Sequence, residues 1–244
     1  MNRRSALILT VAAVAFSVFA RQVSTIPVSR MNQKWWKKRF EQKKALVEQG
    51  GWQLVFLGDS ITHGWEGRRG DTVAPALWKK NFAPYKALNL GYGGDNTEHV
   101  LWRLDNGELD GYHPRLLVLM IGTNNTGHRP LAKESPEDTA AGIKAILERI
   151  ADKSPKTKVA LFAIFPRSAR PTDNMRVRNN KVNKIIKNYA DGERVIWVDI
   201  NDRLLEPDGT LSRKIMPDLL HPNAKGYQIW CDAIMPVIKE TFGR

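Results

Sequence analysis

Ser60 is the residue of this sequence best placed to act as a nucleophile. It follows a short apolar run, residues 54–57, and the pair Gly58-Asp59, so it stands where a buried strand would end. A serine hydroxyl is a weak nucleophile unless a base takes its proton and hydrogen-bond donors receive the charge of the oxyanion. Ser60 therefore predicts acyl transfer only if the rest of the chain supplies those partners.

The candidate base lies near the C-terminus, in Asp218-Leu-Leu-His221-Pro222. The proline disfavours helical backbone at His221, which predicts a tight turn before the last helix. At this separation Asp218 can accept a hydrogen bond from one imidazole nitrogen and leave the other for Ser60. Taken alone, the pair also fits a surface Asp and His beside a helix start.

Gly94 and Asn124 are candidate donors to the oxyanion. The glycine turn 91–94 offers a backbone N–H, and Asn124 offers a side-chain amide after the apolar run 116–121. The alternatives are an ordinary strand-to-helix turn and an asparagine that satisfies loop carbonyls. A phosphate-binding loop is disfavoured, because the third glycine of the dinucleotide fingerprint and the Walker lysine are missing.

Metal catalysis and the α/β-hydrolase fold are both disfavoured. The five histidines are scattered and no pair has the spacing of a zinc site, so no metal is expected. The nucleophile elbow of α/β hydrolases requires Gly-x-Ser-x-Gly, whereas Ile61 and Thr62 follow Ser60.

Three side chains are expected to contact the substrate: His63, Trp65 and Tyr92. They follow candidate catalytic segments in loops after strand ends, where α/β proteins build their pockets. Flat rings and hydrogen-bond donors, with no long apolar lid segment between the motifs, favour a polar alcohol and a short acyl group. For His63 a structural role is an equal alternative.

The elements that must position these residues alternate between strand and helix. The expected strands cover residues 54–57, 86–90, 115–121, 159–165 and 195–198. Apolar residues recur with helical spacing within residues 33–49, 135–153, 182–189 and 230–237. This alternation predicts an α/β fold, a parallel sheet with helices on both faces. The carboxyl ends of such strands share one edge, so residues far apart in sequence converge there.

One folded domain is expected, preceded by two segments of different composition. Residues 1–20 place Arg3 and Arg4 before an uncharged apolar run, which predicts a secretory signal peptide and a periplasmic or extracellular protein. Residues 21–50 are expected to form a linker and a basic helix, and residues 51–244 the domain that carries the candidate site. An uncleaved anchor is the alternative; after cleavage we expect no membrane insertion.

The net charge of +13 does not by itself define a partner. Many of the basic residues lie within residues 21–49, where we interpret them as a solvated helix face, and no nucleic-acid-binding module accompanies them. We therefore expect a small-molecule or polysaccharide ester as substrate and no nucleic-acid partner. The single cysteine, Cys231, excludes an internal disulfide, and the oligomeric state stays open between a monomer and a homodimer.

Four blocks together resemble the GDSL-like or SGNH hydrolase superfamily: Gly-Asp-Ser60, Gly94, Gly-Thr-Asn124 and Asp218-x-x-His221. Their order and approximate spacing match over residues 52–241. Within the superfamily, the segments 89–95 and 99–104 are most similar to the catalytic subunits of platelet-activating-factor acetylhydrolase and their bacterial relatives.

The resemblance implies a three-layer α/β/α sandwich with a five-stranded parallel sheet of flavodoxin-like type. It implies Ser60 as nucleophile, His221 as base and Asp218 as its orienting partner. The Ser60 and Gly94 N–H groups and the Asn124 side chain would form the oxyanion hole, and no cofactor is expected. We predict a secreted serine esterase that removes acetyl groups from carbohydrates. The alternatives are a short-chain phospholipid acetylhydrolase and a catalytically silent glycan-binding protein.

Overall fold

The computed structural model describes residues 23–67 and 70–243, so the predicted signal peptide lies outside the described residues. One parallel sheet contains β1 (Leu54–Gly58), β2 (Ala87–Gly91), β3 (Leu116–Met120), β4 (Lys158–Phe162) and β5 (Val195–Val198). The α-helices are α1 (Lys34–Gln49), α2 (Ser60–His63), α3 (Val73–Asn81), α4 (Thr97–Asp105), α5 (Thr123–His128), α6 (Pro136–Lys153), α7 (Asn174–Ile186), α8 (Asn201–Leu204) and α9 (Ala224–Phe242). Short 3₁₀ helices are η1 (Val23–Thr25), η2 (Gly64–Glu66), η3 (Ala83–Tyr85) and η4 (Lys187–Tyr189).

The strand order, β2-β1-β3-β4-β5, determines where functional residues collect. From β1 the chain crosses to β2 on one side of it and then to β3 on the other. Such a switch point leaves a crevice outside the carboxyl ends of the strands, where open α/β sheets bind their ligands. Ser60 begins α2 directly after β1, and Asn124 lies at the start of α5 after β3, so both face this end of the sheet.

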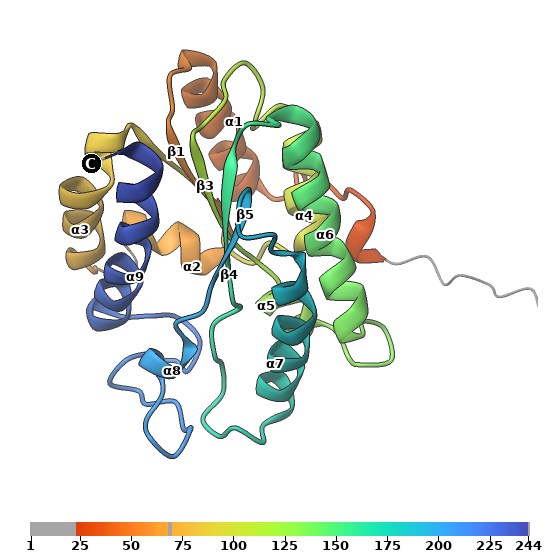
Figure 1. Cartoon of the computed structure of the whole chain (residues 1–244). Coiled ribbons are helices and arrows are strands. Elements are labelled where there is room, and N and C mark those ends of the chain that lie inside the picture. The colour runs from red at the N-terminus through yellow and green to blue at the C-terminus, as the bar shows by residue number, and fades with distance from the viewer. Residues whose placement is uncertain (1–22, 68–69, 244) are drawn as a thin grey trace, which may run out of the picture.

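Alternating strand side chains build two hydrophobic cores. In β1, Val55 and Leu57 pack into one core while Leu54 and Phe56 pack into the other, all at 0% exposure. The helices α4, α6 and α7 cover the first face, and α3 and α9 cover the second (Figure 1). The predicted three-layer α/β/α sandwich with a five-stranded parallel sheet is therefore confirmed.

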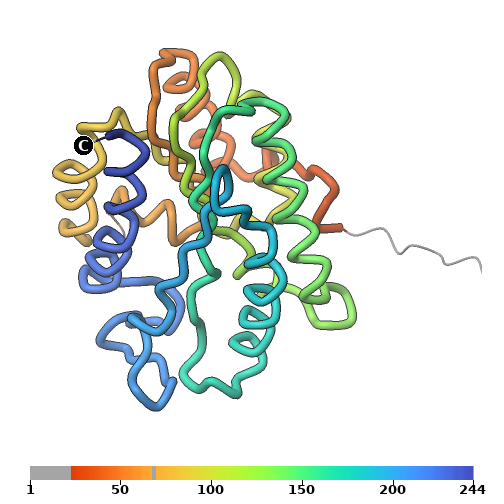
Figure 2. The backbone as a smooth tube through the Cα atoms, in the orientation of Figure 1, coloured from red at the N-terminus to blue at the C-terminus, as the bar shows by residue number. Residues whose placement is uncertain are grey.

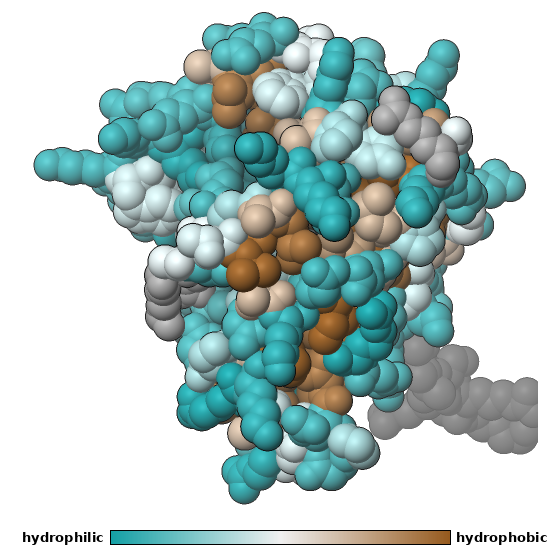
Figure 3. Space-filling view, turned by 90° about the vertical axis from the view of Figure 1, so that its left-hand side faces the viewer, coloured by the Kyte–Doolittle hydropathy of each residue, from teal (hydrophilic) through white to brown (hydrophobic). Residues whose placement is uncertain are grey.

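Helices distant in sequence complete the second layer. Figure 2 shows α3 lying beside the C-terminal helix α9, and the two are in contact. On this face, apolar side chains reach the surface in patches between polar ones (Figure 3). Within residues 23–67 and 70–243, no helix combines the length and apolar character that a membrane span needs.

Local sequence explains how well the element boundaries were predicted. Ser135 accepts a hydrogen bond from the Asp138 N–H and Pro136 is the first residue of α6, so this helix begins where its capping pattern indicates. In contrast, β4 ends at Phe162 although residues 163–165 are apolar and buried. Their apolar character reflects burial in the loop that leaves the sheet rather than strand pairing.

Helix α1 packs on the rest of the fold, and its basic residues lie on two faces: Lys34, Lys37 and Lys38 are exposed as expected, whereas two others are buried. Trp36 is fully buried, and Arg39 and Lys43 are only 9% and 8% exposed. Both cations contact the Glu66 carboxylate, at 2.8 Å for Arg39 and 2.6 Å for Lys43. The charges face inward because an acidic partner after β1 compensates them, and the stripe of Trp36 and Phe40 packs against Tyr92.

Candidate active site

Ser60, His221 and Asp218 form a continuous hydrogen-bonded chain. The Ser60 Oγ lies 2.8 Å from His221 Nε2, and His221 Nδ1 lies 2.8 Å from Asp218 Oδ2. When Nδ1–H donates to the carboxylate, Nε2 is the acceptor for the serine hydroxyl. The structure thus brings together three residues from opposite ends of the domain, in the arrangement that their spacing predicted.

A tight turn holds Asp218 against His221. The Asp218 Oδ1 accepts hydrogen bonds from the N–H groups of Leu220 (3.2 Å) and His221 (2.8 Å), and Leu219 adopts a left-handed φ of 58°. Burial of the carboxyl opposes ionisation, but the hydrogen bonds from His221 and Leu220 outweigh it, so the pKa of Asp218 lies below its usual value. Asp218 is therefore a carboxylate at neutral pH and can orient and stabilise the imidazole.

Ser60, the candidate nucleophile, is the first residue of α2, and close backbone packing fixes that helix. A Cβ added at Gly91 would lie 2.2 Å from the His63 nitrogen and 2.5 Å from the Thr62 carbonyl carbon. Only glycine lets α2 lie this close to the end of β2. As the first residue of α2, Ser60 also presents a backbone N–H without an intrahelical acceptor.

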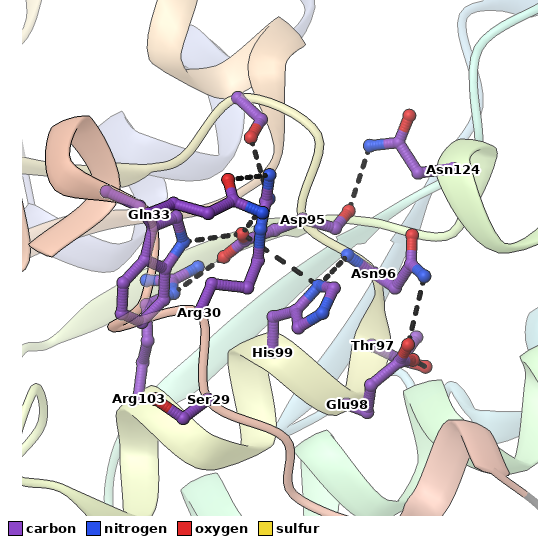
Figure 4. Close-up of polar contacts among 12 residues, drawn as sticks. Ser29, Arg30, Gln33, Asp95, Asn96, Thr97, Glu98, His99, Arg103 and Asn124 are labelled. Carbon is purple, nitrogen blue, oxygen red and sulfur yellow. Dashed lines mark hydrogen bonds and ion pairs between the residues drawn. The ribbon is translucent and has the colours of Figure 1, made fainter. Parts of the chain in front are cut away.

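The three expected oxyanion donors lie at the carboxyl ends of adjacent strands. Gly94 has a φ of +71°, and its N–H donates to no residue within the described part of the chain. The Asn124 side chain is 3% exposed, and its Nδ2 donates one hydrogen to the Asp95 carbonyl at 2.9 Å. Its second amide hydrogen stays available. Figure 4 shows Asn124 and the 95–96 turn facing each other.

Asp59, the residue before Ser60, is a buried ionisable group. It is fully buried; its Oδ1 accepts from the Ile61 N–H at 2.9 Å and caps α2. Its Oδ2 has no hydrogen-bond partner among the described residues. Burial raises the pKa of Asp59 to about 7, and the nearby Asp95 carboxylate contributes to the rise. The group beside Ser60 therefore changes its charge near neutral pH.

Two of the residues expected to contact the substrate are interior residues. Trp65 is 1% exposed and packs in an aromatic cluster with Phe56 and Trp230, while Tyr92 is 0% exposed and its hydroxyl donates to the buried Glu108 carboxylate. A side chain without exposed surface does not reach a substrate, so the expectation is corrected for both. Their rings stabilise the loops that carry the site instead.

His63 remains at the wall of the crevice. Its side chain is 33% exposed, and its Nδ1 lies 4.0 Å from the position that a Cβ on Gly93 would take. A cavity of about 380 Å³ opens next to Asp218 and His221, between residues 70–71 and 217–224. Within residues 23–67 and 70–243, no three His, Cys, Asp or Glu side chains are grouped so that they could hold a metal.

A buried carboxylate next to the oxyanion turn was missed as a site residue. The Asp95 Oδ1 accepts from Trp36 Nε1 and from Arg30, both at 2.8 Å, and its Oδ2 accepts from Arg103 at 2.9 Å (Figure 4). Its partners Trp36 and Arg30 lie 59 and 65 residues away along the chain, so no local pattern could reveal them.

Comparison with known proteins agrees with this geometry. Residues 56–229 match the model of the GDSL-like lipase/acylhydrolase family. Over 186 residues the chain is 36% identical to platelet-activating factor acetylhydrolase IB subunit alpha1 of Bos taurus, covering 75% of this chain and 73% of that protein.

Solved structures share the fold at lower identity. A GDSL-like lipase from Bacteroides thetaiotaomicron superposes with a TM-score of 0.65 at 22% identity, covering 83% of this chain and 97% of the other. An acetyl xylan esterase superposes with a TM-score of 0.62 at 18% identity, covering 76% and 99%. The family model and the bovine relative each span most of the folded domain. The chain therefore belongs to the GDSL-like lipase/acylhydrolase family.

Proposed function

We propose that this chain is a serine esterase in which Ser60 attacks the acyl carbon of an ester. The observation that carries the proposal is the chain of 2.8 Å contacts from Ser60 through His221 to Asp218. Neighbouring backbone and amide donors at Gly94 and Asn124 supply the second requirement, a place for negative charge.

The reaction would proceed in two halves. As Ser60 Oγ bonds to the acyl carbon, its proton passes to His221 Nε2, and the oxyanion receives hydrogen bonds from the Ser60 and Gly94 N–H groups and the Asn124 amide. The imidazolium then protonates the leaving alcohol. A water molecule next gives a proton to His221 as its oxygen bonds to the acyl carbon, and His221 returns that proton to Ser60 Oγ as the acyl–Oγ bond breaks and the acid leaves. Asp218 stabilises the imidazolium throughout.

We infer that the acyl group is short, most simply acetyl, and that the alcohol is a carbohydrate. The fold is shared with an acetyl xylan esterase, and the bovine relative is by name an acetylhydrolase. Exposed Trp35 (46%) and half-exposed His63 beside Gly93 give the crevice a flat ring and a polar group rather than an apolar groove. With the signal peptide expected in residues 1–20, the substrates would be acetylated polymers outside the cytoplasm.

The second candidate is a short-chain phospholipid acetylhydrolase. The 36% identity to a platelet-activating factor acetylhydrolase subunit favours it, and the positive net charge suits a phosphate-bearing alcohol. A catalytically inactive glycan-binding protein of the same fold is the third candidate. The presence of Ser60, His221 and Asp218 in hydrogen-bonded contact makes it the least favoured.

A substrate panel separates the candidates. Acetate release is measured from acetylated xylan, acetylated sialosides and peptidoglycan, from short-chain phospholipids, and from p-nitrophenyl esters of increasing chain length, with Ser60→Ala as the matched control. We expect acetate release from a glycan, with p-nitrophenyl acetate the best chromogenic ester and no turnover by the variant. Equal rates in wild type and Ser60→Ala would refute the proposed esterase activity. Activity confined to phospholipids would refute a carbohydrate as the alcohol part of the substrate.

A further inference from the structure

The segment before α1 lies across the catalytic domain as an N-terminal strap, residues 23–33. Ser24 is fully buried: its hydroxyl donates to Glu134, and its carbonyl accepts from Thr97 Oγ1 at 2.9 Å. Further along, the Val28 N–H donates to the Glu98 carbonyl at 3.1 Å. The strap therefore follows α4 and α6, on the right in Figure 1, and ends at the oxyanion turn.

Arg30 is the residue by which the strap reaches that turn. Its Nη1 donates to the Gly93 carbonyl at 2.9 Å and to Asp95 Oδ1 at 2.8 Å, and its Nη2 donates to Gln33 at 2.9 Å (Figure 4). The Arg30 side chain is 15% exposed. A Cβ added at Gly94 would lie 3.4 Å from both terminal nitrogens of Arg30. The cation is thus packed directly on the glycine whose N–H is the expected donor.

One peptide unit connects this contact to the chemistry. The Gly93 carbonyl and the Gly94 N–H belong to the same planar trans peptide, so they point in opposite directions. A donor that fixes the carbonyl at one end also fixes the direction of the N–H at the other end. A cation on that carbonyl further polarises the peptide and makes the N–H a stronger donor.

Asp95 connects Arg30 to the other expected oxyanion donor, the Asn124 amide. Its carboxylate is shared by Arg30, Arg103 and Trp36, and its backbone carbonyl accepts from the Asn124 amide at 2.9 Å. Arg103 donates to Asp95 at 2.9 Å but also pairs with the buried Glu108, so Arg30 and Arg103 together compensate the Asp95 carboxylate. The contact that Arg30 alone adds is the one to the Gly93 carbonyl.

We propose that Arg30 is a positioning residue of the oxyanion hole, which holds the Gly93–Gly94 peptide so that the Gly94 N–H faces the developing negative charge. The inference rests on the esterase function proposed above. It assigns a role in catalysis to a basic residue of the N-terminal segment, outside the blocks 58–60, 94, 122–124 and 218–221.

The test compares Arg30→Met, Arg30→Lys and a charge-matched control, Lys37→Met. Lys37 is 54% exposed and pairs only loosely with Glu41, at 3.8 Å, so its loss removes one positive charge without touching the site. The readouts are kcat and KM for p-nitrophenyl acetate, the inhibition constant of a boronic acid that forms a tetrahedral adduct with serine, and the thermal unfolding midpoint.

We expect Arg30→Met to lower kcat by about tenfold to a hundredfold with KM changed by less than about threefold, and to weaken boronate binding in proportion to kcat. Arg30→Lys should recover part of kcat, since an ammonium can reach the carbonyl without the planar fork of arginine. Lys37→Met should match the wild type.

The outcomes separate this inference from the proposed function. A folded Arg30→Met enzyme with kcat and boronate affinity within twofold of the wild type would overturn the role of Arg30 alone. If Arg30→Met does not fold, Arg30→Lys decides: lower kcat at unchanged KM supports the role, and wild-type kcat overturns it. A wild-type chain that hydrolyses no ester would overturn the proposed function and the role of Arg30 with it.

Discussion

Asn124 illustrates how a single amide can serve structure and chemistry at once. One of its hydrogens is donated to the Asp95 carbonyl at 2.9 Å, which restrains the rotamer and leaves the other hydrogen for the proposed oxyanion hole. Preorganisation of this kind avoids reorganisation at the moment of reaction, and for that reason such donors contribute several kcal/mol to the transition state.

Replacement of Asn124 by alanine should therefore lower kcat for p-nitrophenyl acetate by about 10² to 10³ while KM changes little. The matched control is Asn188→Ala, an exposed asparagine whose amide donates to a helical carbonyl at 3.3 Å far from the site. A fall of less than about threefold in the Asn124 variant would exclude its amide from the oxyanion hole.

Asp59 gives the protein a pH-dependent stability. The folded state holds a proton on this carboxyl up to a pKa of about 7, whereas the unfolded chain releases it near 3.8. Because the folded state binds more protons, the free energy of unfolding falls as the pH rises between these values, by at most about 1.4 kcal/mol per pH unit.

Asp59→Asn should remove this contribution. The amide oxygen can still accept from the Ile61 N–H, but the group no longer ionises. Urea unfolding of both proteins, at several values from about pH 5 to about pH 7.5, should show a flatter dependence in the variant. Parallel curves would mean that Asp59 does not titrate in this range.

The same contrast explains what the sequence could predict among single residues. Ser60, Asp218 and His221 were predictable because a catalytic chain demands specific residue types in a specific order. Trp65 and Tyr92 were misjudged, because an aromatic residue after a strand can point inward or outward and its identity does not determine which. Arg30 was hidden by the distance along the chain to its partners at 93 and 95.

At the scale of elements, α4 depends on an unusual cap. The His99 Nδ1 accepts the Asn96 N–H at 2.9 Å, so it serves where Glu or Gln normally completes a capping box. Burial lowers the pKa of His99 to about 4 from an ordinary 6.5. Protonation would both convert this acceptor into a donor and bury a charge.

The stability of wild-type protein should therefore carry an acid-sensitive contribution that His99→Gln lacks. As the pH falls from about 6.5 to about 4, His99 binds a proton in the unfolded state but not in the folded state. The free energy of unfolding therefore decreases. Glutamine keeps an acceptor for Asn96 without titrating. The measurement is urea or thermal unfolding of the wild type and His99→Gln at about pH 7.5 and about pH 5. An equal loss of stability between the two pH values in both proteins would argue against the role of His99.

Helices with a regular spacing of apolar residues were predictable from the sequence, whereas the strap was not. The stripe of Ile143, Ile146, Leu147 and Ile150 identifies α6, and all four side chains are buried. Residues 23–33 carry no period, because their backbone is anchored by individual contacts such as those of Ser24 and Arg30. Irregular segments of this kind become recognisable only when the surface beneath them is known.

At the scale of the whole molecule, the predicted signal-peptide cleavage should leave the strap on the mature chain. Cleavage after Ala20, as the sequence predicts, would leave Ser24 and Arg30 on the mature chain and preserve both anchors. We therefore expect mass spectrometry of the native protein to find an N-terminus near Arg21 in the periplasmic or extracellular fraction. A soluble cytoplasmic protein that begins at Met1 would contradict export.

In the proposed reaction, Ser60 forms a covalent bond with the acyl carbon while His221 takes its proton. The most direct test is to trap this residue with an activated phosphonate ester, which serine esterases attack as they attack a substrate, and to locate the adduct by peptide mass spectrometry. We predict one adduct per chain, on Ser60, formed together with the loss of p-nitrophenyl acetate hydrolysis, absent in Ser60→Ala and strongly slowed in His221→Ala. Esterase activity that survives the reagent, or an adduct on another residue, would contradict the account.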